Sequence, residues 1–366
     1  MTRLRSTVAE VDLARVAHNV GVLKPEGAAL MAIVKADGYG HGAAAVAGAA
    51  LKGGAAWLGV ALVEEGLALR EAGIEAPILL LSETPPGSEA VAIAARLTPT
   101  LYSDAGLDRL AAAARGAAIA VHVKVDTGMH RVGVWPPSGA LGFLDRVAAA
   151  GLDLEGLWTH FASSEDDATA TAAQLERFET VTSEARAAGH VPSLLHAANS
   201  GATILHPEAH LDMVRPGIAL LGIAPARGIG DDLDLRPALS WRSAVSHVKR
   251  LPAGERVSYG LRYALPADAW MATVPVGYAD GYPRSASSSA EVLIRGRRCL
   301  VAGSVTMDQI LVDCADMRIE PGDEVVLLGE QGAERVDAWE LAERAGTIAY
   351  EIVSRLGPRV PREYPG

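Results

Sequence analysis

The stretch ALMAIVKADGYGHG, residues 29–42, places Lys35 between an apolar run and a glycine-rich turn. The run at residues 29–34 predicts a buried strand, and the turn leaves the lysine amine at the carboxyl end of that strand. The chain has five lysines among its 33 basic residues. Arginine cannot form a Schiff base or lose its proton near neutral pH, so a lysine at this place indicates a nucleophile. The alternative is a lysine that only extends into solvent from a strand end.

The composition fits a globular protein of two domains, because 366 residues are too many for one ordinary domain. A net charge of −11 argues against nucleic-acid binding, which needs a basic surface. Cys299 and Cys314 form no CxxC motif, and no cysteine–histidine spacing indicates a metal site, so a reducing cytoplasm is the expected compartment. The sequence shows no signal peptide and no apolar run of about 20 residues, so no association with a membrane is expected.

The first two thirds of the chain alternate short apolar runs with alanine-rich helical stretches. We expect helices at residues 63–72, 105–115 and 168–188, and strands at residues 29–34, 57–62, 77–81, 99–102, 119–125, 154–161, 194–197 and 213–214. Eight strand-then-helix units in about 220 residues match a parallel (β/α)8 TIM barrel in number and size. A doubly wound open sheet is the alternative, because local patterns separate these two folds poorly.

Beyond residue 237 the pattern changes to alternating polar and apolar residues with glycine and proline turns. This pattern predicts a smaller, mainly antiparallel β domain, with a helix at residues 337–345 and strands at residues 240–250, 270–276, 291–300, 309–312 and 324–328. We therefore place the domains at residues 1–236 and 237–366, with a linker at residues 224–236. The first strand-like segment of the chain is a candidate member of the second domain.

Polar groups follow five of the predicted barrel strands, at the end where barrel enzymes carry their active sites. Beside Lys35, the strand ends carry Lys124 with Asp126, His160, Asn199 with Ser200, and Arg215 with Gly217. Ser200 and the backbone N–H groups near Gly217 suit an anion, and the last two strand ends are the usual phosphate site of such barrels. A lysine opposite a phosphate site suggests pyridoxal 5′-phosphate (PLP) as the cofactor. A P-loop and a GxGxxG motif after a strand are both absent.

The full set of motifs resembles the alanine racemases, PLP enzymes with an N-terminal barrel and a C-terminal β domain. The resemblance runs over nearly the whole chain, and the motifs that carry it are residues 34–42, 124–129, 196–200, 257–260 and 307–309. It implies that Lys35 binds PLP and acts as the base toward D-alanine, while Tyr259 acts on the opposite face toward L-alanine. In this family Tyr259 and Met307 come from the partner subunit, so a homodimer with shared active sites is implied.

The resemblance also assigns the remaining site residues. Arg131 is implied to contact the cofactor and the substrate carboxylate, and Met307 to bind the substrate. Arg215 is implied to face the pyridine nitrogen, and His160 to orient the ring. The other cofactor-binding residues are Tyr39, Asn199, Ser200, Gly217, Ile218 and Tyr350. Lys124 matches a lysine that is often carbamylated, and Tyr278 and Tyr282 match residues along the access route of the substrate.

We therefore expect a cytoplasmic racemase that interconverts L-alanine and D-alanine by a two-base mechanism and supplies D-alanine for peptidoglycan. A racemase of another small amino acid, such as serine, remains open. A basic-amino-acid decarboxylase with the same two-domain plan would carry an acidic residue at the position of Arg215 and a catalytic cysteine in the second domain. Arg215 contradicts the first requirement, and neither Cys299 nor Cys314 lies in a fitting motif. A non-catalytic PLP-binding protein would leave residues 237–366 unexplained. A barrel hydrolase without a cofactor is the last alternative, and it would differ from a PLP enzyme in showing no absorption of visible light.

Overall fold

The computed structural model describes residues 5–365, which divide into two compact units. The first, called here the barrel unit, comprises Ala14–Gly38 and Ala43–Arg236. The second, the sheet unit, comprises the N-terminal stretch up to Leu13, the short segment Tyr39–Gly42 and the chain from Pro237 onward. The chain therefore leaves the barrel unit for four residues directly after Gly38, in the middle of the motif that follows Lys35.

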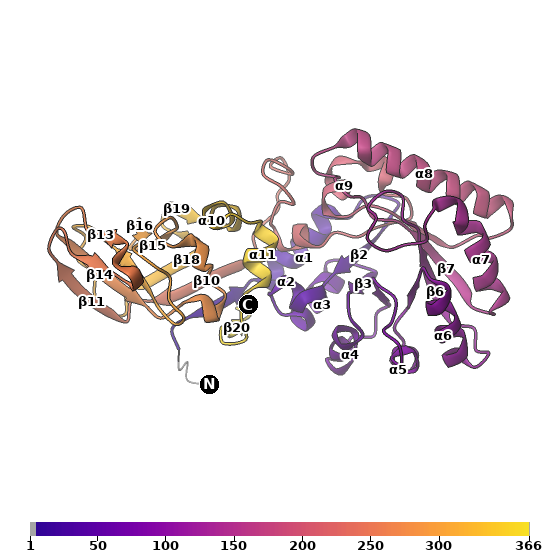
Figure 1. Cartoon of the computed structure of the whole chain (residues 1–366), viewed down its shortest axis with the longest axis horizontal. Helices are drawn as coiled ribbons and strands as arrows, with labels where there is room; N and C mark the ends of the chain where they lie inside the picture. Colours follow the sequence, from indigo (N-terminus) through magenta and orange to yellow (C-terminus); the bar gives the residue numbers. More distant parts are fainter. Residues whose placement is uncertain (1–4, 366) are drawn as a thin grey trace. The chain divides into compact units, whose positions relative to one another are not determined.

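Strands and helices alternate through the barrel unit (Figure 1). The strands are β2 (Ala29–Ile33), β3 (Trp57–Val60), β4 (Ile78–Leu80), β5 (Thr100–Leu101), β6 (Ala120–Lys124), β7 (Asp153–Trp158), β8 (Leu194–His196) and β9 (Met213–Val214). The helices are α1 (Leu13–Leu23), α2 (Lys35–Tyr39), α3 (Ala43–Lys52), α4 (Val63–Glu71), α5 (Glu89–Ala94), α6 (Asp104–Ala114), α7 (Ala140–Ala149), α8 (Ala168–Ala187) and α9 (Ser200–Leu205). Short 3-10 turns are η1 (Pro137–Gly139), η2 (Pro207–Ala209) and η3 (Ile218–Leu221).

The eight strands form a closed ring. Parallel pairs join them in the orders β4-β3-β2-β9 and β5-β6-β7-β8. Thr98 links the two groups on one side through backbone hydrogen bonds with Ile78 and Leu80, and the Arg215 N–H donates to the Ala198 carbonyl on the other. All eight strands overlap segments that the sequence predicted as strands. Most are apolar at nearly every position, as is typical of parallel strands buried on both faces, while β6 and β7 also carry polar side chains.

The sheet unit is built on one large sheet with the order β11-β14-β17-β16-β15-β18-β10-β1-β20. Its strands are β1 (Val8–Val11), β10 (Leu239–Ala244), β11 (His247–Leu251), β14 (Ala269–Val274), β15 (Glu291–Ile294), β16 (Arg297–Val301), β17 (Ile310–Asp313), β18 (Glu324–Gln331) and β20 (Arg362–Glu363), with β19 (Glu334–Val336) paired to β18. Separate from it are the pair β12 (Arg256–Val257) and β13 (Tyr263–Ala264), the helices α10 (Ala338–Ala345) and α11 (Ala349–Ser354), and the turns η4 (Tyr259–Leu261), η5 (Tyr278–Asp280) and η6 (Arg284–Ala286). The predicted fold class, a (β/α)8 barrel with a mainly antiparallel β domain, is confirmed.

Two predicted strands of the sheet unit are each a pair of strands. Residues 240–250 break at Val245, because β10 pairs with β1 and β18 whereas β11 pairs with β14. Residues 291–300 are the hairpin of β15 and β16, which turns at Arg295 (φ 50°) and Gly296 (φ 71°). Positive φ at both central residues is the turn geometry that suits the twist of a two-residue hairpin. Gly296 alone marks this turn, which lacks the Asn-Gly or Asp-Gly pair typical of two-residue hairpins, so the sequence pattern did not show it.

No helix within residues 5–365 combines the length and the apolar character that a bilayer crossing needs.

Candidate functional site

Lys35 begins a left-handed turn at the carboxyl end of β2. Ala36, Asp37, Gly38 and Tyr39 all have φ between 52° and 61°. This conformation is costly for residues with a side chain, and such strain collects at functional sites. The Glu65 carboxylate holds the turn by accepting a hydrogen bond from the Ala36 N–H at 2.6 Å, and the Asp37 carboxylate accepts one from the Ala43 N–H at 2.9 Å. The backbone that directly follows Lys35 is therefore held by two carboxylates.

The surroundings of Lys35 favour its neutral amine. Burial is the main cause that lowers the pKa of Lys35 from its ordinary value of 10.5, and the positive charge of Arg131 lowers it further. Glu65 opposes this shift in part. A neutral amine is the form that attacks a carbonyl carbon, so this environment prepares Lys35 for covalent chemistry.

Lys124, at the end of β6, is buried among cations. Its Nζ lies 4.5 Å above the centre of the Trp158 ring. Burial, followed by the charges of Arg131 and Arg215, lowers the pKa of Lys124 to about 7, against the opposing effect of Asp126. The loop after β6 is shaped by the Asp126 carboxylate, which accepts hydrogen bonds from the N–H groups of Gly128 and His130, both at 3.0 Å. Lys35, Lys124 and Arg131 thus influence one another electrostatically, as expected for groups at one rim.

Arg215 is held in the barrel interior by acceptors. Its Nη2 donates to the carbonyl oxygens of Thr159 at 2.8 Å and Ala197 at 3.0 Å, and it lies 3.3 Å from Nδ1 of His160. Burial lowers the pKa of Arg215 to about 9, which still leaves it a cation at neutral pH. Burial and the charge of Arg215 hold the pKa of His160 well below its usual range. Arg215 is therefore a charged group that can only donate, beside a neutral histidine.

A chain of two buried histidines continues from Arg215. Arg215 Nη1 lies 3.0 Å from His196 Nδ1, and His196 Nε2 lies 2.9 Å from His122 Nδ1. Since arginine only donates, His196 Nδ1 accepts, and His196 Nε2–H then donates to His122. The remaining His122 Nε2–H faces the Glu155 carboxylate at 3.4 Å, longer than an ordinary hydrogen bond. The sequence placed His122 and His196 on barrel strands but did not identify this connection.

Ser200 shows how an anion could be bound after β8 and β9. Its Oγ accepts a hydrogen bond from the Gly217 N–H at 2.9 Å, and it is buried. Asn199 caps α9, with its side-chain oxygen accepting from the Ala202 N–H at 2.9 Å. Within residues 5–365 the Ser200 hydroxyl hydrogen has no acceptor, so it can donate to a bound oxyanion. Ile218 follows Gly217 directly and begins η3, so its N–H lies in the same backbone turn.

Tyr39 and the predicted site residues of the second domain other than Tyr282 form two groups in the sheet unit. Tyr259, Tyr278 and Met307 are exposed, with 76%, 42% and 52% of their surface accessible. The loop of Met307 joins the other two, because Thr306 accepts a hydrogen bond from the Tyr278 N–H at 3.0 Å and Ser304 donates to the Tyr259 carbonyl at 2.9 Å. In the second group, the rings of Tyr39 and Tyr350 lie 6.3 Å apart.

Tyr282 does not suit the access route to which the resemblance assigned it. Its side chain is fully buried in the sheet unit, with its ring 5.7 Å from that of Trp241. Burial is the main cause that raises its pKa. A residue lining an access route must touch solvent or substrate, so we remove Tyr282 from the candidate site and keep the exposed Tyr278.

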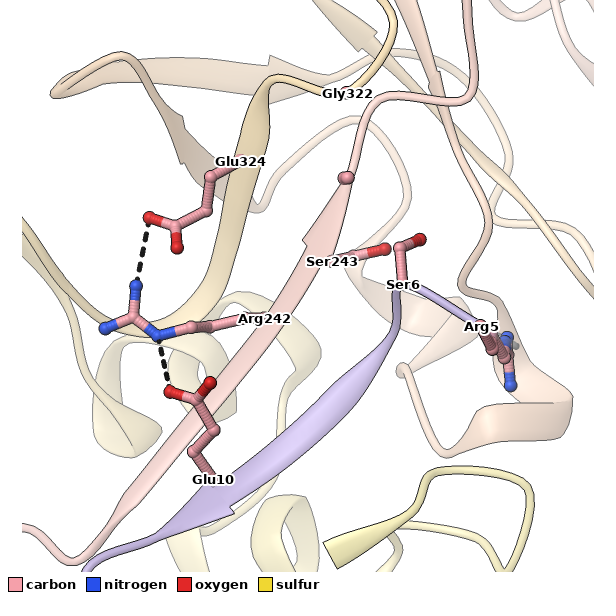
Figure 2. Close-up of a pocket in the computed structure, with 8 residues that line it drawn as sticks. Arg5, Ser6, Glu10, Arg242, Ser243, Gly322 and Glu324 are labelled. Atoms are coloured by element: carbon pink, nitrogen blue, oxygen red, sulfur yellow. Dashed lines mark ion pairs between the residues drawn. The ribbon is translucent and has the colours of Figure 1, made fainter. Parts of the chain in front are cut away.

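The sheet unit contains a hollow of about 400 Å³. Figure 2 shows Arg242 between Glu10 and Glu324, with nitrogen–oxygen distances of 3.1 Å and 3.0 Å. The two carboxylates neutralise the cation, and none of the predicted site residues lines the hollow. It is therefore not part of the candidate site.

Comparison with known proteins gives full-length matches. The family model "Alanine racemase, N-terminal domain" matches residues 11–225, and "Alanine racemase, C-terminal domain" matches residues 238–364. An alanine racemase of Symbiobacterium thermophilum is 49% identical over 99% of this chain and 98% of its own length. The crystal structure of an alanine racemase from Streptomyces lavendulae, with 40% identity, covers 100% of this chain and 98% of its own at a TM-score of 0.95. One from Bacillus anthracis, with bound L-Ala-P, has 36% identity and a TM-score of 0.94 over 100% of this chain and 96% of its own.

Proposed function

Because the chain belongs to the alanine racemase family, it is an enzyme that interconverts L-alanine and D-alanine, and we propose that it does so with PLP bound by Lys35. The observation that carries this proposal is the environment of Lys35. Its amine stands at the carboxyl end of a barrel strand, in a fixed left-handed turn, with its pKa lowered by burial and by Arg131. The rim of the barrel is where such enzymes carry out their chemistry.

The residues present fit PLP at three points. The Lys35 amine, whose pKa is lowered by burial, suits the aldehyde, and the donor-only Arg215 suits an unprotonated ring nitrogen. The Ser200 hydroxyl hydrogen, which has no acceptor within residues 5–365, suits a phosphate oxygen. Asn199, Gly217, Ile218, Tyr39 and Tyr350 would complete the phosphate site, with His160 beside the ring. When bound, PLP supplies an electron sink that acidifies the α hydrogen of alanine.

We propose that Lys35 and Tyr259 hold the two proton-transfer positions. Racemisation needs one base on each face of a planar carbon, because a single group would have to cross the plane between the two steps. Lys35 would take the proton from D-alanine and Tyr259 from L-alanine. Arg131 would bind the substrate carboxylate, and the Met307 backbone would contact the substrate. Arg215 would keep the ring nitrogen unprotonated, which weakens the sink and limits transamination.

A homodimer is the assembly that this arrangement supports. Tyr259, Leu261, Tyr278 and Met307 leave 42–76% of their surfaces accessible in the single chain. Large side chains gathered at an exposed site mark an interaction surface. We propose that a second copy covers them and receives Tyr259 and Met307 in its own active site. Tyr278 would then line the access route of the substrate.

Lys124 is the candidate for carbamylation. With its pKa lowered to about 7, a substantial fraction of its amine is neutral at physiological pH. The amine nitrogen would bond to the carbon of CO2, and one proton would leave to solvent. The product carries a negative charge beside the cations Arg131 and Arg215, so it relieves the repulsion that lowers the pKa. We propose that this anion positions Arg131.

One experiment tests the proposal. The purified protein is mixed with PLP, reduced with borohydride and mapped by mass spectrometry, while conversion of D-alanine to L-alanine is followed by a chiral assay. We expect the label on Lys35 and loss of racemisation in Lys35→Ala, with Lys52→Ala as a control, because Lys52 is an exposed lysine in α3. A label on another lysine, or a colourless wild type, would refute the proposal. The same assay with serine ranks the substrates.

We also propose a cytoplasmic location and a role in supplying D-alanine for peptidoglycan. The two cysteines are buried free thiols, which agrees with a reducing compartment.

A further inference from the structure

Ser258, the residue before Tyr259, has a backbone conformation that side chains rarely adopt. Its φ is 62° and its ψ is −178°, a region populated almost only by glycine. Gly260 (φ 76°) and Leu261 (φ 49°) follow, so three of the four residues 258–261 have positive φ. Such a conformation persists only where surrounding contacts impose it, and Tyr259 lies in the middle of it.

Two hydrogen bonds impose this conformation. The Ser258 hydroxyl donates to the Ser304 carbonyl oxygen at 2.6 Å, and the Ser304 hydroxyl donates to the Tyr259 carbonyl oxygen at 2.9 Å. The bonds run in opposite directions between the same two loops: one holds the Ser258 side chain directly before Tyr259, and the other holds the peptide group that follows the Tyr259 Cα. We call this pair the serine clamp.

The loop that carries Ser304 is itself anchored. The Gly303 N–H donates to the Ser288 hydroxyl at 3.1 Å, and the Val305 N–H donates to the Ser287 hydroxyl at 2.9 Å. A side chain at Gly303 would lie 2.9 Å from both the Ser258 Cβ and the Val257 carbonyl, so only glycine lets the two loops approach this closely. Ser304 is buried, while Tyr259 projects into solvent from the clamped backbone.

We propose that Ser258 and Ser304 are positioning residues that fix the direction of the Tyr259 phenol for proton transfer. The inference rests on the proposed role of Tyr259 as the base toward L-alanine. Neither serine would touch the substrate. They would remove rotational freedom from the tyrosine backbone, and the strain at Ser258 would be maintained by the folded sheet unit.

Isotope effects separate positioning of Tyr259 from general damage. The two enantiomers of alanine are equally stable, so any variant must change kcat/KM equally in both directions. If Tyr259 is held less firmly, proton transfer at Tyr259 slows, while proton transfer at Lys35 keeps its rate. The deuterium isotope effect on kcat/KM should therefore rise for [2-²H]L-alanine and fall toward unity for [2-²H]D-alanine. A decrease in the amount of folded enzyme changes neither isotope effect.

The test compares Ser304→Ala and Ser258→Gly with wild type, as enzymes loaded with PLP. Ser246→Ala is the matched control, because its hydroxyl also donates to a backbone carbonyl of the sheet unit, that of Thr273, at 2.9 Å. We expect kcat/KM to fall about tenfold in Ser304→Ala, with the two isotope effects moving apart. Equal or unchanged isotope effects in both clamp variants would overturn the proposal.

Two further variants keep the outcomes distinct. Tyr259→Phe must shift the isotope effects or abolish turnover; if it does neither, the proposed role of Tyr259 fails. If Tyr259→Phe acts as expected and Ser304→Ala behaves like Ser246→Ala, only the clamp fails. As a readout without cofactor, apo Ser258→Gly should melt at a higher temperature than apo Ser258→Ala, because both lack the hydroxyl and only glycine tolerates φ 62°. If apo Ser258→Ala melts at the higher temperature, the backbone at Ser258 is not strained and the argument for the serine clamp fails.

Discussion

Replacing Gly156 in β7 by alanine tests the packing beneath the active-site rim. A Cβ at Gly156 would lie 2.4 Å from Nδ1, 2.5 Å from Cε1 and 2.6 Å from Cγ of His122. Ordinary contacts begin at 3.4 Å, so the ring must move by about 1 Å. His122 is fully buried, with Trp57 at 5.3 Å on one side and His196 at 5.1 Å on another, so it has no room to retreat.

Overpacking of this kind costs about 1–3 kcal/mol. For a unit of this size each kcal/mol lowers the melting temperature by about 2–4 °C, so we expect Gly156→Ala to melt at least about 2 °C below wild type. The assay is thermal unfolding of the apo protein. The displaced ring would also lengthen the 2.9 Å His122–His196 contact that leads to Arg215, so racemisation should slow as well.

Gly142→Ala in α7 is the control. A Cβ there meets only the end of the Arg146 side chain, at 3.8 Å, in the same barrel unit. Alanine in an exposed helix position stabilises by about 0.5–1 kcal/mol relative to glycine. If Gly156→Ala melts at or above the wild-type temperature while Gly142→Ala behaves as expected, the claim that His122 is immobile is refuted.

Three other changes have definite expected outcomes. Tyr282→Phe should raise the melting temperature, because the buried hydroxyl has no hydrogen-bond partner within residues 5–365 and its removal ends a desolvation cost of about 1–3 kcal/mol; a lower melting temperature would show that the hydroxyl is paired. In CO2-free buffer the contribution of Lys124 should make stability rise between pH 7 and pH 10.5, because the unfolded chain binds the proton more tightly in that window; urea titrations of Lys124→Met should show a flatter rise. Asp280→Asn should cost about 1–3 kcal/mol in the same titration, because the buried carboxylate accepts two 2.7 Å hydrogen bonds from Arg5; an unchanged midpoint would count against it.

Local pattern was sufficient for the barrel and insufficient for parts of the sheet unit. Parallel strands buried on both faces appear as apolar runs, and the polar residues that end them mark the rim, so Lys35, Lys124 and Arg215 could be placed from the sequence. The β15–β16 hairpin was missed because its turn, Arg295–Gly296, lacks the Asn-Gly or Asp-Gly pair that usually marks a two-residue hairpin.

The connections that matter most in the site are not local. Ser258 and Ser304 are 46 positions apart, and His122 and His196 are 74 apart, so no spacing in the sequence predicts their contacts. Tyr282 was misplaced for a different reason: Tyr278 and Tyr282 occur in one short motif, and only burial distinguishes the exposed side chain from the core one.

The position of β1 has a consequence for biosynthesis. Val8 of β1 pairs with Arg242 of β10, and Ala9 pairs with Arg362 of β20, so β1 remains without either neighbour until synthesis has passed β10. A fragment that starts at Pro237 would expose the free edge of β10, and unpaired edges invite aggregation. A sheet unit expressed alone should therefore include residues 5–12, joined behind β20 by a linker long enough to cross the sheet, because β1 and β20 are parallel neighbours.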